Sequence, residues 1–88
     1  MNIEFLSSFE RDLHNVREPG ILIRVKNVIE LAEKAKTPYD IEHLKKLRGK
    51  SEYFRIKVGD YRIGLILHGD VLLFVRFLHS KDIYRYFP

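Results

Sequence analysis

The feature that most constrains the fold is the stretch YFRIKVGDYRIG at residues 53–64, in which apolar and charged side chains alternate. Strict alternation is typical of a β-strand with one buried face. Gly59-Asp60 suits a two-residue hairpin turn with glycine in the first position. With that turn, the register places one apolar set on a single face, namely Phe54, Ile56, Val58, Tyr61, Ile63 and Leu65. A slip by one residue would bury the charged side chains, so we expect the register to be well specified.

The other face of this hairpin gathers three cations without an interleaved acid. The register pairs Lys57 with Arg62, a like-charge pair that destabilises a sheet by a few tenths up to ~1 kcal/mol. It also sets Arg55 opposite Gly64, which leaves that part of the face open. A bound anion would reverse the sign of this electrostatic term, so we predict an anion site in preference to a merely solvated strand face. If the next turn, Gly69-Asp70, also has two residues, the third strand places His79 on the same face as Arg62.

Two amphipathic helices are predicted before the hairpin. Ser7 and Glu10 have the spacing of a capping box. The first helix is expected to stop near Glu18, because Pro19 disfavours helical geometry in the residue before it and is itself well placed to open a second helix. The second helix has one apolar stripe, formed by Ile21, Val25, Val28, Ile29, Ala32 and Ala35.

The predicted elements follow the order β-α-α-β-β-β. NIEFL forms an opening strand, residues 39–52 form a connector, and VLLFVRFLH is apolar on both faces, as a central strand would be. SKDIYRYFP closes the chain as one helical turn. We therefore predict an α+β fold with a small, antiparallel-rich sheet and an N-terminal helical hairpin packed on one face. No repeat, linker or low-complexity tract divides residues 1–88, so we expect a single domain.

The net charge of +4 is distributed unevenly along the chain. Residues 1–42 hold six Lys/Arg and eight Asp/Glu, a balance of −2, whereas residues 43–88 hold ten and four, a balance of +6. A basic C-terminal half suits a polyanionic partner. The absence of cysteine favours a reducing, cytoplasmic setting and excludes thiolate metal sites. We expect no signal peptide, because residues 1–12 carry acids and lack a basic region followed by an apolar stretch. We expect no membrane span, because the apolar runs are too short.

A cation cluster with histidine and tyrosine nearby favours phosphate chemistry. RNA carries its own nucleophile, the 2′-hydroxyl, so a protein can cleave it without metal through positioning, charge stabilisation and proton transfer. The serines and glycines match neither a nucleophile elbow nor a phosphate-binding loop. We expect neither a metal nor a cofactor, because no paired metal-ligand spacing occurs among His14, His43, His68 and His79.

Two segments of the C-terminal half carry a family resemblance. LKKLRGKSEYFRIKVGDYRIGLIL, followed by VLLFVRFLHSKDIYR, resembles the RelE/ParE superfamily of type II toxin–antitoxin toxins, particularly its RelE branch. The match runs along nearly the whole chain, and its specific parts are the VGDYR hairpin and the terminal H-x-K-D-x-Y-R box. The resemblance implies a toxin that is a ribosome-dependent, metal-independent endoribonuclease, an mRNA interferase. Such a toxin cuts mRNA in the A site by 2′-hydroxyl attack and inhibits translation.

The resemblance also implies roles for five residues, three of which the hairpin pattern had already singled out. Lys57 or Arg55 assists deprotonation of the 2′-hydroxyl, and Arg62 stabilises the phosphate of the transition state. His79 protonates the leaving 5′-oxygen, at a position where some family members carry arginine. Tyr84 matches the C-terminal tyrosine of the family and positions the substrate.

The partners implied by the resemblance are a cognate antitoxin, the ribosome and mRNA. The toxin and antitoxin are expected to form a hetero-oligomer that binds operator DNA. Contacts to the backbone of ribosomal RNA are expected from Lys45, Lys46, Arg48, Lys50, Lys81 and Arg85. Two alternatives stay open: a ParE-like DNA gyrase inhibitor, which generally lacks the basic catalytic set, and a catalytically inactive nucleic-acid-binding partner of an antitoxin.

Overall fold

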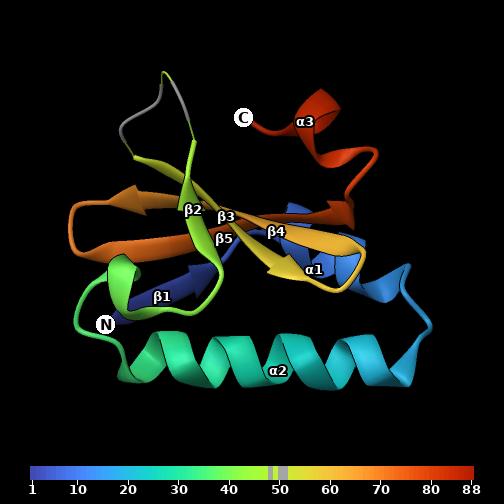
Figure 1. Cartoon of the computed structure of the whole chain (residues 1–88), viewed down its shortest axis with the longest axis horizontal. Coiled ribbons are helices and arrows are strands. Elements are labelled where there is room, and N and C mark those ends of the chain that lie inside the picture. The colour runs from blue at the N-terminus through green and yellow to red at the C-terminus, as the bar shows by residue number, and fades with distance from the viewer. Residues whose placement is uncertain (48, 50–51) are drawn as a thin grey trace.

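A five-stranded mixed sheet forms the centre of the computed structural model, which describes residues 1–47, 49 and 52–88 (Figure 1). The strands lie in the order β1-β5-β4-β3-β2, with β1 parallel to β5 and every other neighbouring pair antiparallel. The predicted α+β class is confirmed. In chain order the elements are β1 (Asn2–Phe5), α1 (Ser7–His14), α2 (Pro19–Lys34), a 3-10 helix (Pro38–Asp40), β2 (Leu44–Lys46), β3 (Tyr53–Val58), β4 (Tyr61–His68), β5 (Val71–His79) and α3 (Ile83–Tyr86).

The register predicted for the hairpin of β3 and β4 is confirmed. Lys57 is the partner of Arg62, and Arg55 is the partner of Gly64. The turn has two residues, and Gly59 adopts a φ of 58°, in the left-handed region that glycine enters without steric cost.

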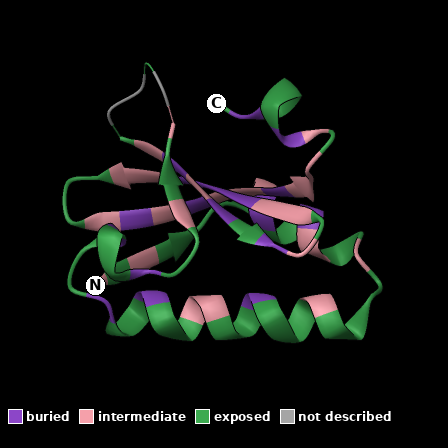
Figure 2. Ribbon diagram, viewed as in Figure 1, coloured by how far each residue is buried: buried purple, intermediate pink, exposed green. Residues whose placement is uncertain are grey.

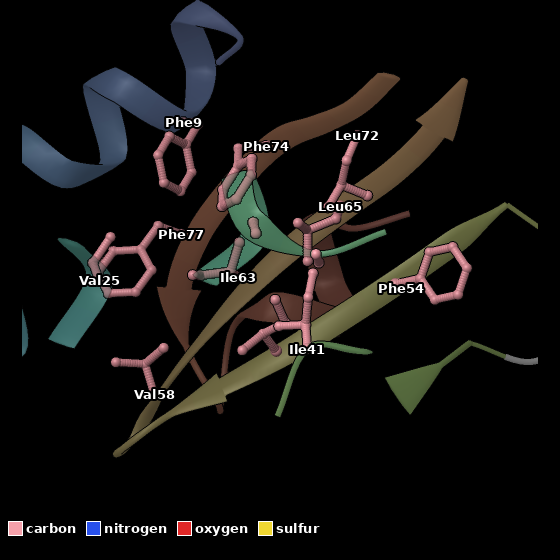
Figure 3. Packing of buried hydrophobic residues seen from close by; sticks show 13 residues of the cluster. Phe9, Val25, Ile41, Phe54, Val58, Ile63, Leu65, Leu72, Phe74 and Phe77 are labelled. Carbon is pink, nitrogen blue, oxygen red and sulfur yellow. The ribbon is translucent and has the colours of Figure 1, made fainter. Parts of the chain in front are cut away.

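One face of the sheet carries the hydrophobic core, and α1 and α2 cover it (Figure 3). Phe9 of α1 and Val25 of α2 are buried against strand residues such as Phe74 and Phe77. The side of α2 that faces the sheet is buried or half-buried, and its outer side is exposed (Figure 2). This confirms the predicted apolar stripe, because Val25, Ala32 and Ala35 are buried and the other three members pack against the core.

Helix α1 differs from its predicted bounds at both ends. It ends at His14, four residues before Glu18, because the N–H of Asn15 bonds the carbonyl of Asp12 in a tightened last turn. The predicted capping box is wrong: Ser7 is the first helical residue, and the N-cap is Leu6, which makes no side-chain capping bond. Pro19 opens α2 as predicted. None of the helices in residues 1–47 and 52–88 is long and apolar enough to cross a membrane.

Side chains of α1 take the place of a strand along part of β5. Strand β1 pairs only with the first half of β5, up to Phe74. Beyond that point, Ser8 Oγ donates to the carbonyl of Val75 over 2.5 Å, and the Phe77 N–H donates to Asp12 Oδ2 over 2.9 Å. The backbone of β5 thus keeps hydrogen-bond partners after β1 has ended, as a buried edge requires.

The segment predicted as a connector contains the additional strand β2. Its three residues pair antiparallel with β3 at the edge of the sheet, and they place Lys45 opposite Arg55. A strand this short has no readable alternation, and its lysines are typical of an exposed sheet edge. The sequence pattern therefore gave no signal for it.

Candidate functional site

The face of the sheet opposite the core carries five cations, which we call the basic face. The strand registers arrange them in two rows that cross the sheet. One row joins Lys45, Arg55, Gly64 and Arg76, and the other joins Lys57, Arg62 and Leu78. The structure therefore brings together the three cations predicted from the hairpin and adds Lys45 and Arg76.

Most of the basic face has no counter-charge in the part of the chain that the structure describes. Among residues 1–47, 49 and 52–88, the one salt bridge joins Arg76 to Asp12. Arg55, Lys57 and Arg62 have no carboxylate partner within these residues. Two like-charged pairs, Lys45–Arg55 and Lys57–Arg62, face each other directly across neighbouring strands. Each such pair destabilises the fold unless an anion lies between the charges.

The C-terminal segment lies across part of the basic face, on the side of the sheet away from α2 (Figure 1). The Phe87 ring occupies the space beside Gly64, where a Cβ atom would lie only 2.7 Å from the ring. The prediction that the face is open opposite Arg55 is therefore wrong, because a side chain distant in sequence fills that space. Beside it, the Tyr84 hydroxyl accepts a hydrogen bond from Arg55 Nε over 3.2 Å.

The guanidinium group of Arg62 is fixed by its own hairpin. Its Nη1 donates to the carbonyls of Gly59 and Tyr61, each over 2.9 Å. These bonds leave the N–H groups of Nε and Nη2 for another acceptor. A guanidinium held in this way presents a planar pair of donors that matches two phosphate oxygens.

Arg76 differs from the other cations of the basic face because its guanidinium group has contacts on both sides. Its Nε and Nη2 donate to the two carboxylate oxygens of Asp12 over 2.7 and 3.1 Å. The Tyr86 ring lies on its other side, 5.6 Å from Arg76 Cζ. The hydrogen bond to Asp12 raises the pKa of Arg76 above its ordinary value. Sequence reasoning missed this residue, although one arginine inside an otherwise apolar central strand was a usable signal.

A hollow of about 330 Å³ opens next to the Arg55–Tyr84 pair. It lies between β2 and the C-terminal segment. Its lining residues are Lys45, Lys46, Leu47, Tyr84 and Pro88. An aromatic ring and two ammonium groups around one hollow suit a nucleotide, which offers a base for stacking and a phosphate for ion pairing.

The predicted face of His79 is wrong. The turn between β4 and β5 does have two residues, as expected, but β5 contains a β-bulge that inserts Val75 between the partners of Gly64 and Leu65. The extra residue reverses the alternation of side chains. His79 therefore pairs with Tyr61, on the core side, while Leu78 pairs with Arg62.

The His79 ring lies at the end of β5 against Tyr61, with ring centroids 5.7 Å apart. Its Nδ1 accepts a hydrogen bond from the backbone N–H of Lys81 over 3.1 Å. Because Nδ1 accepts, the neutral ring carries its proton on Nε2, which points the donor away from that backbone contact.

The remaining predicted residues are dispersed. Lys46, Lys81 and Arg85 are exposed. Lys46 pairs with Phe54, so its position in β2 belongs to the core side of the sheet, although the residue also lines the hollow beside Tyr84. Arg48 and Lys50 lie outside the described residues. Within the described part of the chain, no group of three His, Asp or Glu side chains is arranged to hold a metal ion.

Comparison with known proteins identifies full-length relatives. No protein-family model matches the chain. The chain is 42% identical over 90 residues to Toxin RelE3 of Methanocaldococcus jannaschii, with 100% of both chains covered. It also matches a chain of the RelB-RelE antitoxin-toxin complex from Methanococcus jannaschii with a TM-score of 0.81 and 39% identity, covering 96% of this chain and 98% of that one. YafQ from E. coli strain BL21(DE3) shares the fold, with a TM-score of 0.75 at 17% identity, over 94% of this chain and 97% of that one.

Proposed function

This chain belongs to the RelE family of type II toxin–antitoxin toxins, and we propose that it cuts messenger RNA in the ribosomal A site and so inhibits translation. The observation that supports this activity is the basic face, where Arg55, Lys57 and Arg62 have no carboxylate partner in the described part of the chain. An RNA phosphate supplies the missing negative charge. The Tyr84 hydroxyl, which accepts a hydrogen bond from Arg55 Nε, lies beside these cations.

The proposed reaction is attack of the 2′-oxygen on the adjacent phosphorus. The P–O5′ bond breaks, which leaves a 2′,3′-cyclic phosphate on one fragment and a 5′-hydroxyl on the other. One proton leaves the 2′-hydroxyl with the assistance of Lys57 or Arg55, and one proton reaches the 5′-oxygen from His79. Arg62 stabilises the negative charge that grows on the phosphate, and Tyr84 positions the nucleotide.

The local bonds of the site support the role of Arg62. Because Gly59 and Tyr61 already hold its Nη1, the guanidinium needs little reorganisation when phosphate charge develops. Arg55 is held similarly by Tyr84 and keeps the N–H groups of its two terminal nitrogens for substrate. Donors fixed before the reaction stabilise a transition state better than mobile ones.

The role of His79 needs a test of its own, because its ring lies on the core side of the sheet. If His79 donates the proton, His79→Ala should slow cleavage of ordinary RNA by about 10²-fold or more. An RNA with sulfur in place of the 5′-bridging oxygen has a leaving group that needs no proton. We expect this substrate to be cut at nearly equal single-turnover rates by His79→Ala and the wild type.

Two other outcomes would exclude His79 as the proton donor. An equal loss with the sulfur substrate would assign His79 to positioning, through its contact with Tyr61. Unchanged cleavage of ordinary RNA would exclude it altogether. His68→Ala is the matched control, because His68 is the exposed last residue of β4, at the end of the strand away from Tyr61.

The proposal includes partners. By analogy with the RelB-RelE antitoxin-toxin complex, a cognate antitoxin binds and neutralises the toxin. We also propose that the resulting hetero-oligomer binds operator DNA. Toxin and ribosome meet in the cytoplasm. The proposed contacts with ribosomal RNA come from Lys45, Lys46, Arg48, Lys50, Lys81 and Arg85.

The activity is tested with purified toxin and ribosomes that carry mRNA in the A site. Mapping of 5′ ends should show cuts at codon-defined positions, and the same mRNA without ribosomes should stay intact. No metal should be required, so cuts should persist when the toxin itself has been treated with chelator before addition. Intact mRNA with inhibited DNA supercoiling would instead establish a gyrase inhibitor. Intact mRNA with binding to RNA or operator DNA alone would establish a catalytically inactive binding partner.

A further inference from the structure

Gly64 lies buried in the middle of β4, between Arg55 of β3 and Arg76 of β5. Its backbone is not in the left-handed region, so no turn requires glycine, and glycine inside a strand weakens the strand. The space beside it is the distinctive feature. A Cβ atom would lie 2.7 Å from Cγ and Cδ2 of Phe87 and 2.9 Å from Cε2. The Phe87 ring therefore occupies the space that a side chain at position 64 would fill.

The C-terminal segment is fixed at two buried points. Helix α3 has four residues, too few to be stable without tertiary contacts. Ile83 is fully buried at its start, and Phe87 just after its end is 2% exposed. The Phe87 ring packs 5.5 Å from the Tyr53 ring, and the Phe87 N–H donates to the Ile83 carbonyl over 2.8 Å. These two side chains determine where the residues between them lie.

Tyr84 lies between the two buried points and depends on them. Its side chain is 57% exposed, and its hydroxyl contacts Arg55 Nε over 3.2 Å. We propose that Gly64 is a positioning residue of the RNA-cleaving site: the space at its Cα seats Phe87, and Phe87 holds the Tyr84 hydroxyl on Arg55. This inference rests on the proposed function for its effect on cleavage, whereas its effect on the geometry of Tyr84 stands independently.

A positioning role and a simple packing role predict different effects of Gly64→Ala on the cleavage rate. The new methyl group must displace an aromatic ring that has Tyr53 on one flank and the sheet beneath it. The ring and α3 then move together. A displacement of about 1 Å at a reacting group lowers rates by about 10²-fold. A packing role alone would lower stability and leave the rate of the folded protein unchanged.

The geometry is measured by nuclear magnetic resonance of the purified toxin in a catalytically silent background, Arg62→Ala. An aromatic ring against Gly64 shifts the Gly64 Hα resonances upfield, and the ring protons of Tyr84 should show contacts with the Arg55 side chain. Gly64→Ala should abolish the Tyr84–Arg55 contacts. Gly20→Ala is the matched control, because a Cβ atom at Gly20 meets nothing within 4 Å. Unchanged Tyr84 contacts in Gly64→Ala would overturn the inference, whatever the toxin does to RNA.

The effect on cleavage is measured by single turnover on programmed ribosomes. Gly64→Ala should lower the cleavage rate by about 10²-fold, and the concentration of toxin at half-saturation should not change. In a Tyr84→Phe background, Gly64→Ala should add little further loss, because both changes remove the same contact. Additive losses would show that Gly64 acts on the reaction by another route, and would overturn the positioning role.

A size exchange completes the test and covers the case in which Gly64→Ala folds poorly. Phe87→Leu removes ring atoms that the new methyl group meets, so the double variant Gly64→Ala/Phe87→Leu should fold and cut faster than Gly64→Ala. No recovery in a folded double variant would contradict the inference. If the wild type cuts no RNA, the proposed function fails, and the resonance measurements alone decide whether Gly64 positions Tyr84.

Discussion

Replacing Arg62 with alanine is expected to lower the single-turnover rate of mRNA cleavage on the ribosome by about 10²–10³-fold, the usual cost of removing one fixed donor to a developing oxyanion. The reason is geometric as well as electrostatic. Gly59 and Tyr61 hold Nη1, so Nε and Nη2 are directed before the substrate arrives. Toxin binding to the ribosome should weaken much less than the rate falls, because many other basic side chains contribute to that affinity.

Two further variants make the Arg62 prediction specific. Arg62→Lys keeps the charge but loses the planar donor pair, so it should restore ribosome binding and only part of the rate. Lys26→Ala is the control for loss of one positive charge, because Lys26 is exposed on α2, far from the basic face in the fold. A rate for Arg62→Ala close to that of Lys26→Ala would show that Arg62 does not stabilise the transition state.

Stability of Arg62→Ala is a separate outcome. The change relieves the repulsion with Lys57 across the hairpin, but it also removes two hydrogen bonds to backbone carbonyls. Each bond contributes roughly 0.5–1.5 kcal/mol and each like-charge pair costs less than ~1 kcal/mol, so the net stability should fall slightly. Lys57→Ala relieves the same repulsion without losing such bonds, and its stability should stay equal or rise.

Replacing Asp12 with alanine is expected to lower the free energy of unfolding by about 3 kcal/mol, near the lower end for breaking a buried ion pair. Asp12 is 7% exposed and accepts three hydrogen bonds, two from Arg76 and one from the Phe77 N–H. Without the carboxylate, the Phe77 N–H is buried with no partner, and Arg76 loses its counter-charge. Urea unfolding should show an earlier midpoint with an unchanged slope.

The control for Asp12 separates the charge from the hydrogen bonds. Asp12→Asn keeps an acceptor for the Phe77 N–H and loses only the negative charge, so it should lose clearly less stability than Asp12→Ala. A loss below about 1 kcal/mol for Asp12→Ala would mean that the pair with Arg76 behaves like an exposed surface salt bridge. Ser8, which donates to the Val75 carbonyl, would then be the side chain of α1 that supports the edge of β5.

The sequence predicted most of what depends on local pattern. Alternation over residues 53–64 placed Arg55, Lys57 and Arg62 on one side, and the structure confirms that register. Helical periodicity predicted the buried stripe of α2, and Pro19 marked its start. These features were readable because each depends on the two-residue or 3.6-residue repeat of one element, and burial of one face enforces that repeat.

Predictions from local pattern failed where an inserted residue reversed the alternation of a strand, or where segments distant in the sequence come into contact. The bulge at Val75 adds one residue to β5, which moves His79 to the core side and gives Arg62 the partner Leu78 instead. The open space predicted beside Gly64 is filled by Phe87, 23 positions away in the sequence. The strand β2, with Lys45 opposite Arg55, has only three residues and no period to read.

The sequence by itself thus determined which cations share a face and that this face lacks acids from its own hairpin. Only the tertiary structure decided how those cations are held. The carbonyls of its own turn hold Arg62, and the Tyr84 hydroxyl contacts Arg55. Tyr84 in turn is positioned by Phe87, which packs on Gly64. The physical reason is the range of the interactions. Side-chain alternation is a property of neighbouring residues, whereas the place of a four-residue helix is set by the contacts it makes across the sheet.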